Sequence, residues 1–177
     1  MKTRRLFFAL WPSAQVRHSI VEAFSQLPQP IKGRIIQPHN LHVTLHFIGS
    51  VTGEVKDCMH AAAQTIRSNS FECDLDRFGS FRRARILWMG CQNVSVELTQ
   101  LHHKLAVALE SCGYQSEKRV FSPHVTLMRK YVGPLNNQIA EQIDFSIPWL
   151  VNEFVLVESH SDKQGVNYQV IEKYPLS

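Results

Sequence analysis

Apolar positions along the chain recur with two different periods, which predict helices and strands. Apolar side chains at helical spacing predict three helices, at residues 14–27, about 53–68 and about 94–111. Buried or alternating runs predict strands at residues 5–11, 35–36, 41–48, 71–78, 85–90, 121–131, 149–158 and 168–174. Helices and strands therefore share one chain, which favours an α+β fold.

One four-residue sequence, His-Val-Thr-Leu, occurs in two of the predicted strands, at residues 42–45 and 124–127. Each copy follows a strand and a helix, and the distance from that strand to the histidine is 36 residues in one case and 38 in the other. Matching order and spacing predict two related lobes, each with one motif strand. The two motif strands have to face one shared cleft if they act together.

The repeated letters place the same two functional groups on one face of each strand. Side chains two residues apart point to the same side, so His42 lies beside Thr44 and His124 beside Thr126. Two imidazoles suit general acid and base catalysis near neutral pH, because a neutral ring takes a proton while a protonated ring gives one. Two hydroxyls can donate to the oxygens of a phosphate. The pattern indicates phosphoryl transfer without a metal.

Arg129 follows the second motif in a position that strand parity does not explain. It lies five residues after His124, so a regular strand points it away from the histidine. Either the strand twists or bulges there and Arg129 binds phosphate, or Arg129 has a structural role. The first motif has Phe47 at the same place, so such a phosphate clamp is one-sided.

These residues resemble the 2H phosphoesterases, a family with two His-x-Thr motifs on a duplicated fold, and within it the RNA 2′,3′-cyclic phosphodiesterases first named bacterial 2′-5′ RNA ligases. The resemblance covers nearly the whole chain and is carried by segments 5–9, 40–45, 48–49 and 123–129. It implies one domain over residues 1–177, whose two pseudo-symmetric lobes have antiparallel sheets across a central cleft and helices on the outer faces.

The resemblance also implies a reaction, the hydrolysis of a terminal RNA 2′,3′-cyclic phosphate to a 2′-phosphomonoester. It gives His42 as proton donor and His124 as proton acceptor, an assignment that two identical motifs cannot supply. Thr44, Thr126 and Arg129 are the implied phosphate-binding residues. RNA is the implied partner, with no metal and no cofactor, and the reverse 2′-5′ ligation is expected to be weak in water.

Two other functions fit the same residues. One keeps the site and changes the substrate to a small cyclic nucleotide, such as an ADP-ribose cyclic phosphate. The other is a non-catalytic RNA-binding module. An aromatic and basic segment can serve an RNA end or form a solvated turn over two core aromatics; it contains Phe78, Phe81, Arg82, Arg83 and Arg85.

Composition adds weaker constraints. A net charge of +4 suits RNA and equally suits an ordinary soluble surface. The apolar run near the N-terminus stops at Pro12, too short for a signal peptide or a membrane span, so we expect a buried strand in a cytoplasmic monomer.

Two further expectations concern the cysteines and the other histidines. The four cysteines are widely spaced and are expected to be reduced thiols. His42 and His46 are too far apart on a strand to share a zinc ion. The adjacent His102 and His103 are expected to face solvent on a helix.

Overall fold

The computed structural model describes residues 3–28, 31–133, 143–162 and 165–177. Within them the chain forms helices α1 (Ala14–Ser25), α2 (Gly53–Gln64), α3 (Val96–Glu110) and the short 3-10 helix η1 (Pro38–Asn40). The strands are β1 (Arg4–Leu10), β2 (Lys32–Ile35), β3 (Val43–Val51), β4 (Phe71–Leu75), β5 (Arg77–Phe81), β6 (Ile86–Gly90), β7 (His124–Val132), β8 (Ile147–Val151), β9 (Glu153–Asp162) and β10 (Gly165–Pro175). No helix of this part of the chain is long and apolar enough to cross a membrane.

Each α-helix begins where a hydroxyl side chain caps it. Ser13, Thr52 and Ser95 have extended backbone, and each side-chain oxygen accepts a hydrogen bond from the backbone N–H three residues later. Such caps satisfy a backbone donor that has no partner inside the helix. The predicted helices are therefore confirmed, with ends shorter by a few residues.

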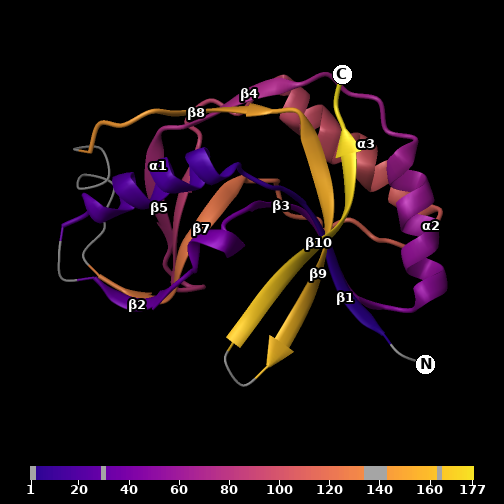
Figure 1. The fold of residues 1–177 in the computed structure, drawn as a ribbon, viewed down its shortest axis with the longest axis horizontal. Coiled ribbons are helices and arrows are strands. Elements are labelled where there is room, and N and C mark those ends of the chain that lie inside the picture. The colour runs from indigo at the N-terminus through magenta and orange to yellow at the C-terminus, as the bar shows by residue number, and fades with distance from the viewer. Residues whose placement is uncertain (1–2, 29–30, 134–142, 163–164) are drawn as a thin grey trace.

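Most strands belong to one antiparallel sheet with the order β10-β9-β1-β3-β7-β6-β5, in which β2 also pairs with β7 (Figure 1). The two motif strands, β3 and β7, are neighbours in its middle. Their registered pairing is a single residue pair, Val43 opposite Val125, and both valines are buried. The sheet thus has a β10-β9-β1-β3 half and a β7-β6-β5 half that meet at the two motifs.

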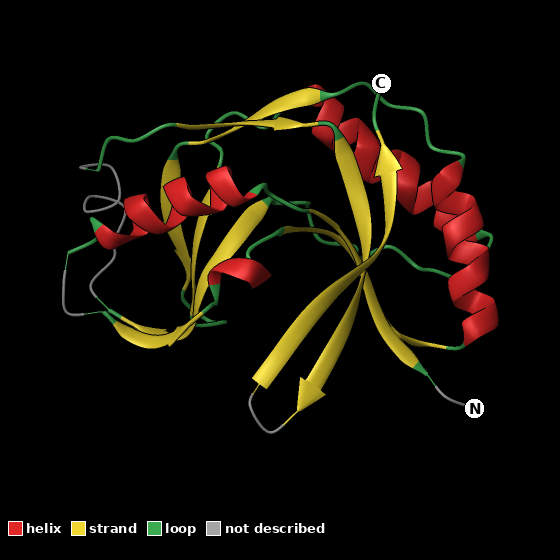
Figure 2. Ribbon diagram, in the orientation of Figure 1, coloured by secondary structure: helices red, strands yellow, loops and turns green. Residues whose placement is uncertain are grey.

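The helices are exchanged between these halves of the sheet. α1 comes between β1 and β3 in the chain, yet it lies over the β7-β6-β5 half, while α2 and α3 lie together along the other half (Figure 2). Contacts agree with this view, because α3 touches α2 and β3, and α2 touches β10. Each half of the sheet therefore buries its apolar side chains against helices from a different part of the sequence.

Two predicted strands are each divided in two. The alternating run at 71–78 forms β4, which pairs with β8 in a separate two-stranded sheet, and β5, which pairs with β6. Asp76 marks the division, and its carboxylate accepts a hydrogen bond from the backbone N–H of Gln92 at 2.7 Å. The run at 149–158 likewise divides at Asn152 into β8 and β9. The apolar alternation loses its phase at each break, where Arg77 and Glu153 take the place of the next apolar residue, but this local signal does not show that the chain changes sheets. The residues between the last two predicted strands favour a hairpin loop at 161–165, part of which lies outside the described residues.

The expectation of four reduced thiols is wrong for one pair. Cys58 in α2 and Cys112 just after α3 form a disulfide, with Cα atoms 5.8 Å apart. Cys73 and Cys91 are free and buried, with sulfur atoms 3.0 Å apart. The bonded cysteines are 54 residues apart in sequence and meet because α2 and α3 lie side by side, which cysteine spacing alone does not show.

Reducing the disulfide should destabilise the protein by about 2–4 kcal/mol, because the cross-link limits the unfolded chain. Urea unfolding with and without reductant measures this difference. A Cys58→Ser and Cys112→Ser double variant is the control, since its stability should not respond to reductant. Thiol titration of the denatured protein should find two thiols before reduction and four after it. Four thiols at the start would contradict the bond.

Candidate functional site

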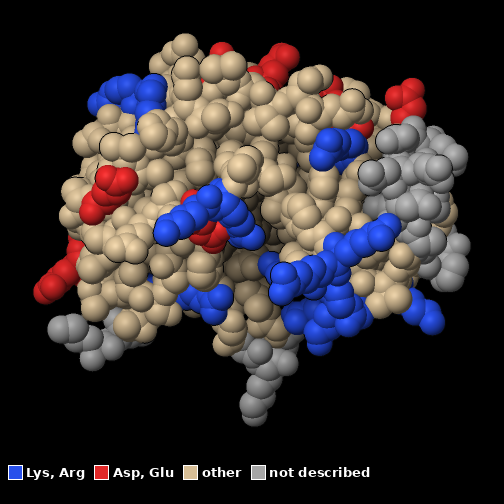
Figure 3. Space-filling view, turned by 180° about the vertical axis from the view of Figure 1, so that it is seen from behind, with Lys and Arg blue, Asp and Glu red and all other residues tan. Residues whose placement is uncertain are grey.

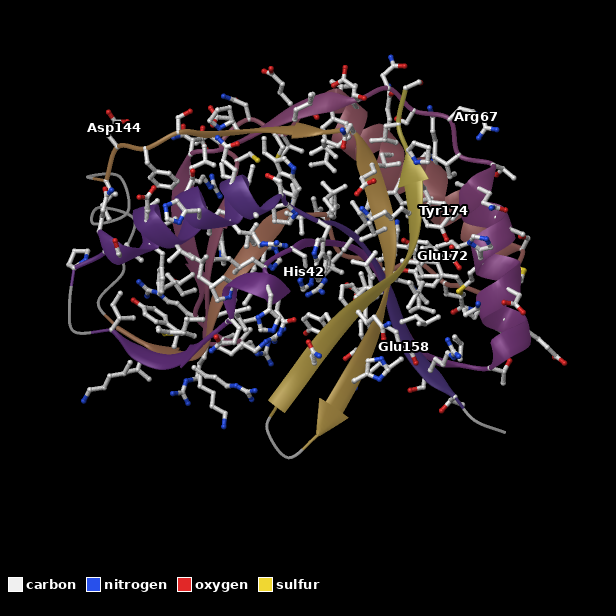
Figure 4. The ribbon with its side chains drawn as sticks, in the orientation of Figure 1. His42, Arg67, Asp144, Glu158, Glu172 and Tyr174 are labelled. Atoms are coloured by element: carbon white, nitrogen blue, oxygen red, sulfur yellow. A yellow bond between two sulfur atoms is a disulfide. The ribbon has the colours of Figure 1, made fainter. Side chains whose placement is uncertain are left out.

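The motif strands bring the two histidines and two threonines together in a crossed arrangement. With Val43 opposite Val125, one step along an antiparallel pair sets His42 opposite Thr126 and Thr44 opposite His124. All four side chains then lie on one face of two adjacent strands. His42 lies in the middle of the molecule (Figure 4).

Each histidine ring is held in the same way by a backbone carbonyl two residues before it. His42 Nδ1 lies 2.7 Å from the Asn40 oxygen, and His124 Nδ1 lies 2.7 Å from the Ser122 oxygen. A carbonyl only accepts, so each Nδ1 carries the hydrogen and each neutral ring presents an unprotonated Nε2. The Thr44 hydroxyl donates to His42 Nε2 at 3.1 Å. Both rings are thus fixed in the tautomer that can accept a proton.

Burial keeps both histidines neutral in the free protein. Loss of hydration lowers the pKa of His42 from 6.5 to about 4, against the opposing effect of the Asn40 carbonyl, and the charges of Arg129 and His124 lower it further. Burial also lowers the pKa of His124, with added contributions from Arg119 and Arg129. The positive charge of Arg129 thus contributes to the lowered pKa of both rings.

Aromatic side chains surround His42. Trp11 stacks on its ring at 5.4 Å between centroids, Phe7 lies at 4.9 Å, and the edge of Tyr168 meets it at 5.2 Å. His124 instead meets the edge of Phe81, at 4.9 Å. The rings exclude water from His42 on several sides, which explains the low pKa.

Asn40 is a site residue that sequence reasoning missed. Its side chain is buried; the amide donates to the Val166 carbonyl at 3.0 Å and accepts from the Tyr168 N–H at 3.3 Å. Its own carbonyl holds the ring of His42. Asn40 therefore fixes strand β10, including Tyr168, against the first motif. In the sequence, Asn40 is a polar residue in the turn before the strand and the first residue of segment 40–45, but neither observation indicates this role.

A β-bulge resolves the orientation of Arg129. The pairing of β7 with β6 skips Leu127, since Thr126 pairs with Trp88 and Met128 with Leu87. Leu127 and Met128 are consecutive and both buried, and Arg129 after them is exposed. In a regular strand, residues five apart point to opposite faces. The unpaired residue Leu127 adds one position to this strand, so Arg129 points to the same face as His124.

Strand β3 carries the same bulge. Its pairing with β1 skips Leu45, and Leu45 and His46 are both buried. Phe47 then occupies the place that corresponds to Arg129, with 44% of its surface exposed and the Arg5 guanidinium 5.0 Å from its ring centre. The two strands are alike in backbone and differ in charge at this position, as the sequence predicted.

A cavity of about 690 Å³ opens beside His124 and Thr44. Its walls come from β3, from the β5–β6 turn at 80–86, from α3, and from segment 114–122. Seen from behind the view of Figure 1, Lys and Arg side chains gather on both sides of a hollow in the surface (Figure 3).

His102 lies in the cavity wall rather than in solvent, because α3 packs against β3. Its ring is stacked between His46 at 4.1 Å and Phe121 at 3.9 Å, so the expectation of solvent exposure is wrong for this residue. His103 beside it is exposed, as expected. Within the described residues, no group of three or more His, Cys, Asp or Glu side chains could hold a metal ion.

Comparison with known proteins agrees with this arrangement. The family pattern of the 2′-5′ RNA ligase superfamily matches residues 11–163, so the chain belongs to that superfamily. An Escherichia coli (strain K12) protein named RNA 2′,3′-cyclic phosphodiesterase is 29% identical over 98% of this chain and 97% of its own length. A Thermus thermophilus protein of the same name is 28% identical over 97% and 90%. The crystal structure of E. coli LigT complexed with 3′-AMP superposes with a TM-score of 0.90 at 29% identity, covering 99% of both chains.

Replacing Asn40 with alanine should loosen β10 from the first motif. Two buried hydrogen bonds are lost, so we expect a loss of about 1–3 kcal/mol in unfolding free energy. The pKa of His42, measured by NMR, should rise from about 4 toward 6.5 as water reaches the ring. Asn167→Ala, at an exposed position of β10, is the matched control. An Asn40 variant with the same stability and the same His42 pKa as Asn167→Ala would contradict this role.

Proposed function

We propose that this chain hydrolyses terminal 2′,3′-cyclic phosphates of RNA to 2′-phosphomonoesters without a metal. The observation that carries the proposal is the crossed His-Thr arrangement, in which two carbonyl-held imidazoles present Nε2 to one site. Membership in the superfamily and the names of the relatives support the same reaction.

In the proposed mechanism, His124 is the proton acceptor and His42 the proton donor. His124 Nε2 takes a proton from water, and the water oxygen forms a bond to phosphorus. The bond from phosphorus to the 3′ oxygen breaks, and protonated His42 gives its Nε2 proton to that oxygen. The product keeps its phosphate on the 2′ oxygen.

Thr44, Thr126 and Arg129 are proposed to hold the phosphate. The hydroxyls donate to its non-bridging oxygens, and the guanidinium fork of Arg129, turned inward by the bulge, supplies a positive charge. In the free protein His42 is neutral at neutral pH. A bound phosphate anion favours the charged ring and raises its pKa, so the substrate itself helps to protonate the donor.

The proposal extends from the site to the whole chain. The two halves of the sheet act as two lobes of one domain over residues 1–177 that share the cleft. The protein works as a monomer in the cytoplasm on RNA ends, away from membranes. If the two histidines exchange the roles of proton donor and proton acceptor, the reverse reaction, 2′-5′ ligation, becomes possible. It is weak because water favours hydrolysis.

A small nucleotide is the second candidate substrate. Solved structures of E. coli LigT are described as complexes with ATP and with NADP+, and each resembles this chain at 27–28% identity. An ADP-ribose cyclic phosphate would use the same histidines. Shortened substrates separate the two candidates, because a cyclic mononucleotide should react as well as an RNA end only if RNA is not the substrate.

His42→Ala and His124→Ala should each reduce turnover by about 10²–10⁴-fold. The assay uses a short RNA with a 2′,3′-cyclic phosphate end in the presence of EDTA and separates 2′- from 3′-phosphate products. His103→Ala, which removes an exposed histidine, is the control and should keep full activity. Equal activity of the His42 and His103 variants, or a 3′-phosphate product, would refute the proposed mechanism.

The dependence of turnover on pH should be bell-shaped. Because both histidine pKa values lie below 6.5 in the free protein, the maximum of kcat/KM should lie below pH 6.5. Protonation of His124 reduces activity at the acid side, and loss of the His42 proton reduces it at the alkaline side. The alkaline limb of kcat should lie at higher pH than that of kcat/KM, since bound phosphate raises the pKa of His42. A rate that stays flat from mildly acidic to alkaline pH argues against two acting histidines.

A further inference from the structure

The cavity beside the histidines contains an aromatic pile that the proposed mechanism does not use. His46, His102 and Phe121 stack in order, with centroids 4.1 and 3.9 Å apart. His46 is fixed at both nitrogens, because the Tyr114 hydroxyl donates to Nδ1 at 3.1 Å while Nε2 donates to the His102 carbonyl at 2.8 Å. The pile is therefore rigid at its buried end.

Phe121 is the outermost ring of this pile and lines the cavity. It is only partly buried, and Val120 next to it is 91% exposed. Phe121 also precedes Ser122, whose carbonyl holds the catalytic candidate His124. A flat aromatic surface thus lies three residues from a reacting group. Unpaired bases in RNA are commonly bound by stacking on such surfaces.

The cavity walls are also positively charged. Arg82 and Arg83 line it from the β5–β6 turn, and Arg119 lines it from the opposite segment. Glu117 is the one acidic side chain among the described residues that line the cavity, and it forms an ion pair with Arg119. Among the described residues, Arg82 and Arg83 form no ion pair. These two guanidinium groups are therefore available to a negatively charged ligand.

We propose, on the basis of the function proposed above, that this cavity holds unpaired nucleotides of the RNA end. A base stacks on Phe121, and Arg82 and Arg83 contact backbone phosphates. A cavity of about 690 Å³ encloses roughly one or two nucleotides, so a base-paired end has to lose its partner strand before it enters. The substrate class is therefore a single-stranded RNA end, and a blunt duplex end is excluded.

One RNA strand with a cyclic phosphate end tests this inference in three forms: alone, annealed to leave a three-nucleotide overhang, and annealed to a blunt end. The first two should react alike, and the blunt end should react at least tenfold more slowly in kcat/KM. Equal rates on blunt and single-stranded ends overturn the proposal. A 2′,3′-cyclic mononucleotide is the fourth substrate, because it requires the histidines and has no second phosphate.

Variants of the cavity walls separate charge from stacking. Arg82→Ala with Arg83→Ala should raise KM for the single strand about tenfold and reduce its salt slope by about 1.4, with no change on the cyclic mononucleotide. Arg17→Ala with Arg67→Ala removes the same charge outside the cavity and should change neither; Arg67 lies far from His42 in Figure 4. An effect equal in both double variants would overturn the proposed phosphate contacts.

Replacing the Phe121 ring with an aliphatic or a different aromatic side chain tests the stacking contact. Phe121→Leu should raise KM for the single strand about tenfold, and Phe121→Trp should restore it. A leucine variant that binds as well as the tryptophan variant overturns the stacking. If the cyclic mononucleotide reacts normally but blunt and single-stranded ends react alike and the wall variants have no effect, only the proposed binding of nucleotides in the cavity is refuted. If no substrate reacts, the proposed function is refuted as well.

Discussion

The contact between Val43 and Val125 is the constraint on which the site depends. This one pair joins the two halves of the sheet at the place where each carries its motif. Because antiparallel partners alternate strictly, burying these valines turns both histidines and both threonines to the opposite face. A shift by one residue in either strand would exchange the buried and the functional side chains. Packing and catalysis therefore impose the same register.

The backbone around the two motifs is repeated more faithfully than the side chains. Both histidines are held by a carbonyl two residues earlier, and both strands bulge at the leucine that ends the motif. The duplicated framework places equivalent atoms on both sides of the site. Some side chains differ between the two motifs: Phe47 corresponds to Arg129, and aromatic rings surround His42. These differences make the surroundings of the two histidines unequal. In the proposed reaction, such a difference distinguishes the histidine that gives a proton from the one that accepts it.

Sequence patterns predicted the helices, the strands and the pairing of the two motifs better than they predicted how distant segments of the chain pack together. Helical spacing and the paired motifs depend on local order, so they can be recognised in the printed letters. The disulfide of Cys58 and the burial of the His102 ring both depend on where α3 packs. The role of Asn40 depends on its contact with β10. From the sequence, a bulge before Arg129 was one of two alternatives, because the pairs that reveal the extra residue, Trp88 with Thr126 and Leu87 with Met128, join distant parts of the chain.

The exchange of helices has a consequence for how the chain is made. β1 and β3 emerge from the ribosome early, but the helix that packs against β3 ends only at Glu110. Helix α1 likewise contacts strand β8, which ends only at Val151. Neither half can complete its core while the chain is short, and native contacts of long sequence separation form slowly. We expect the nascent chain to expose apolar surface until more than two thirds of it has been synthesised.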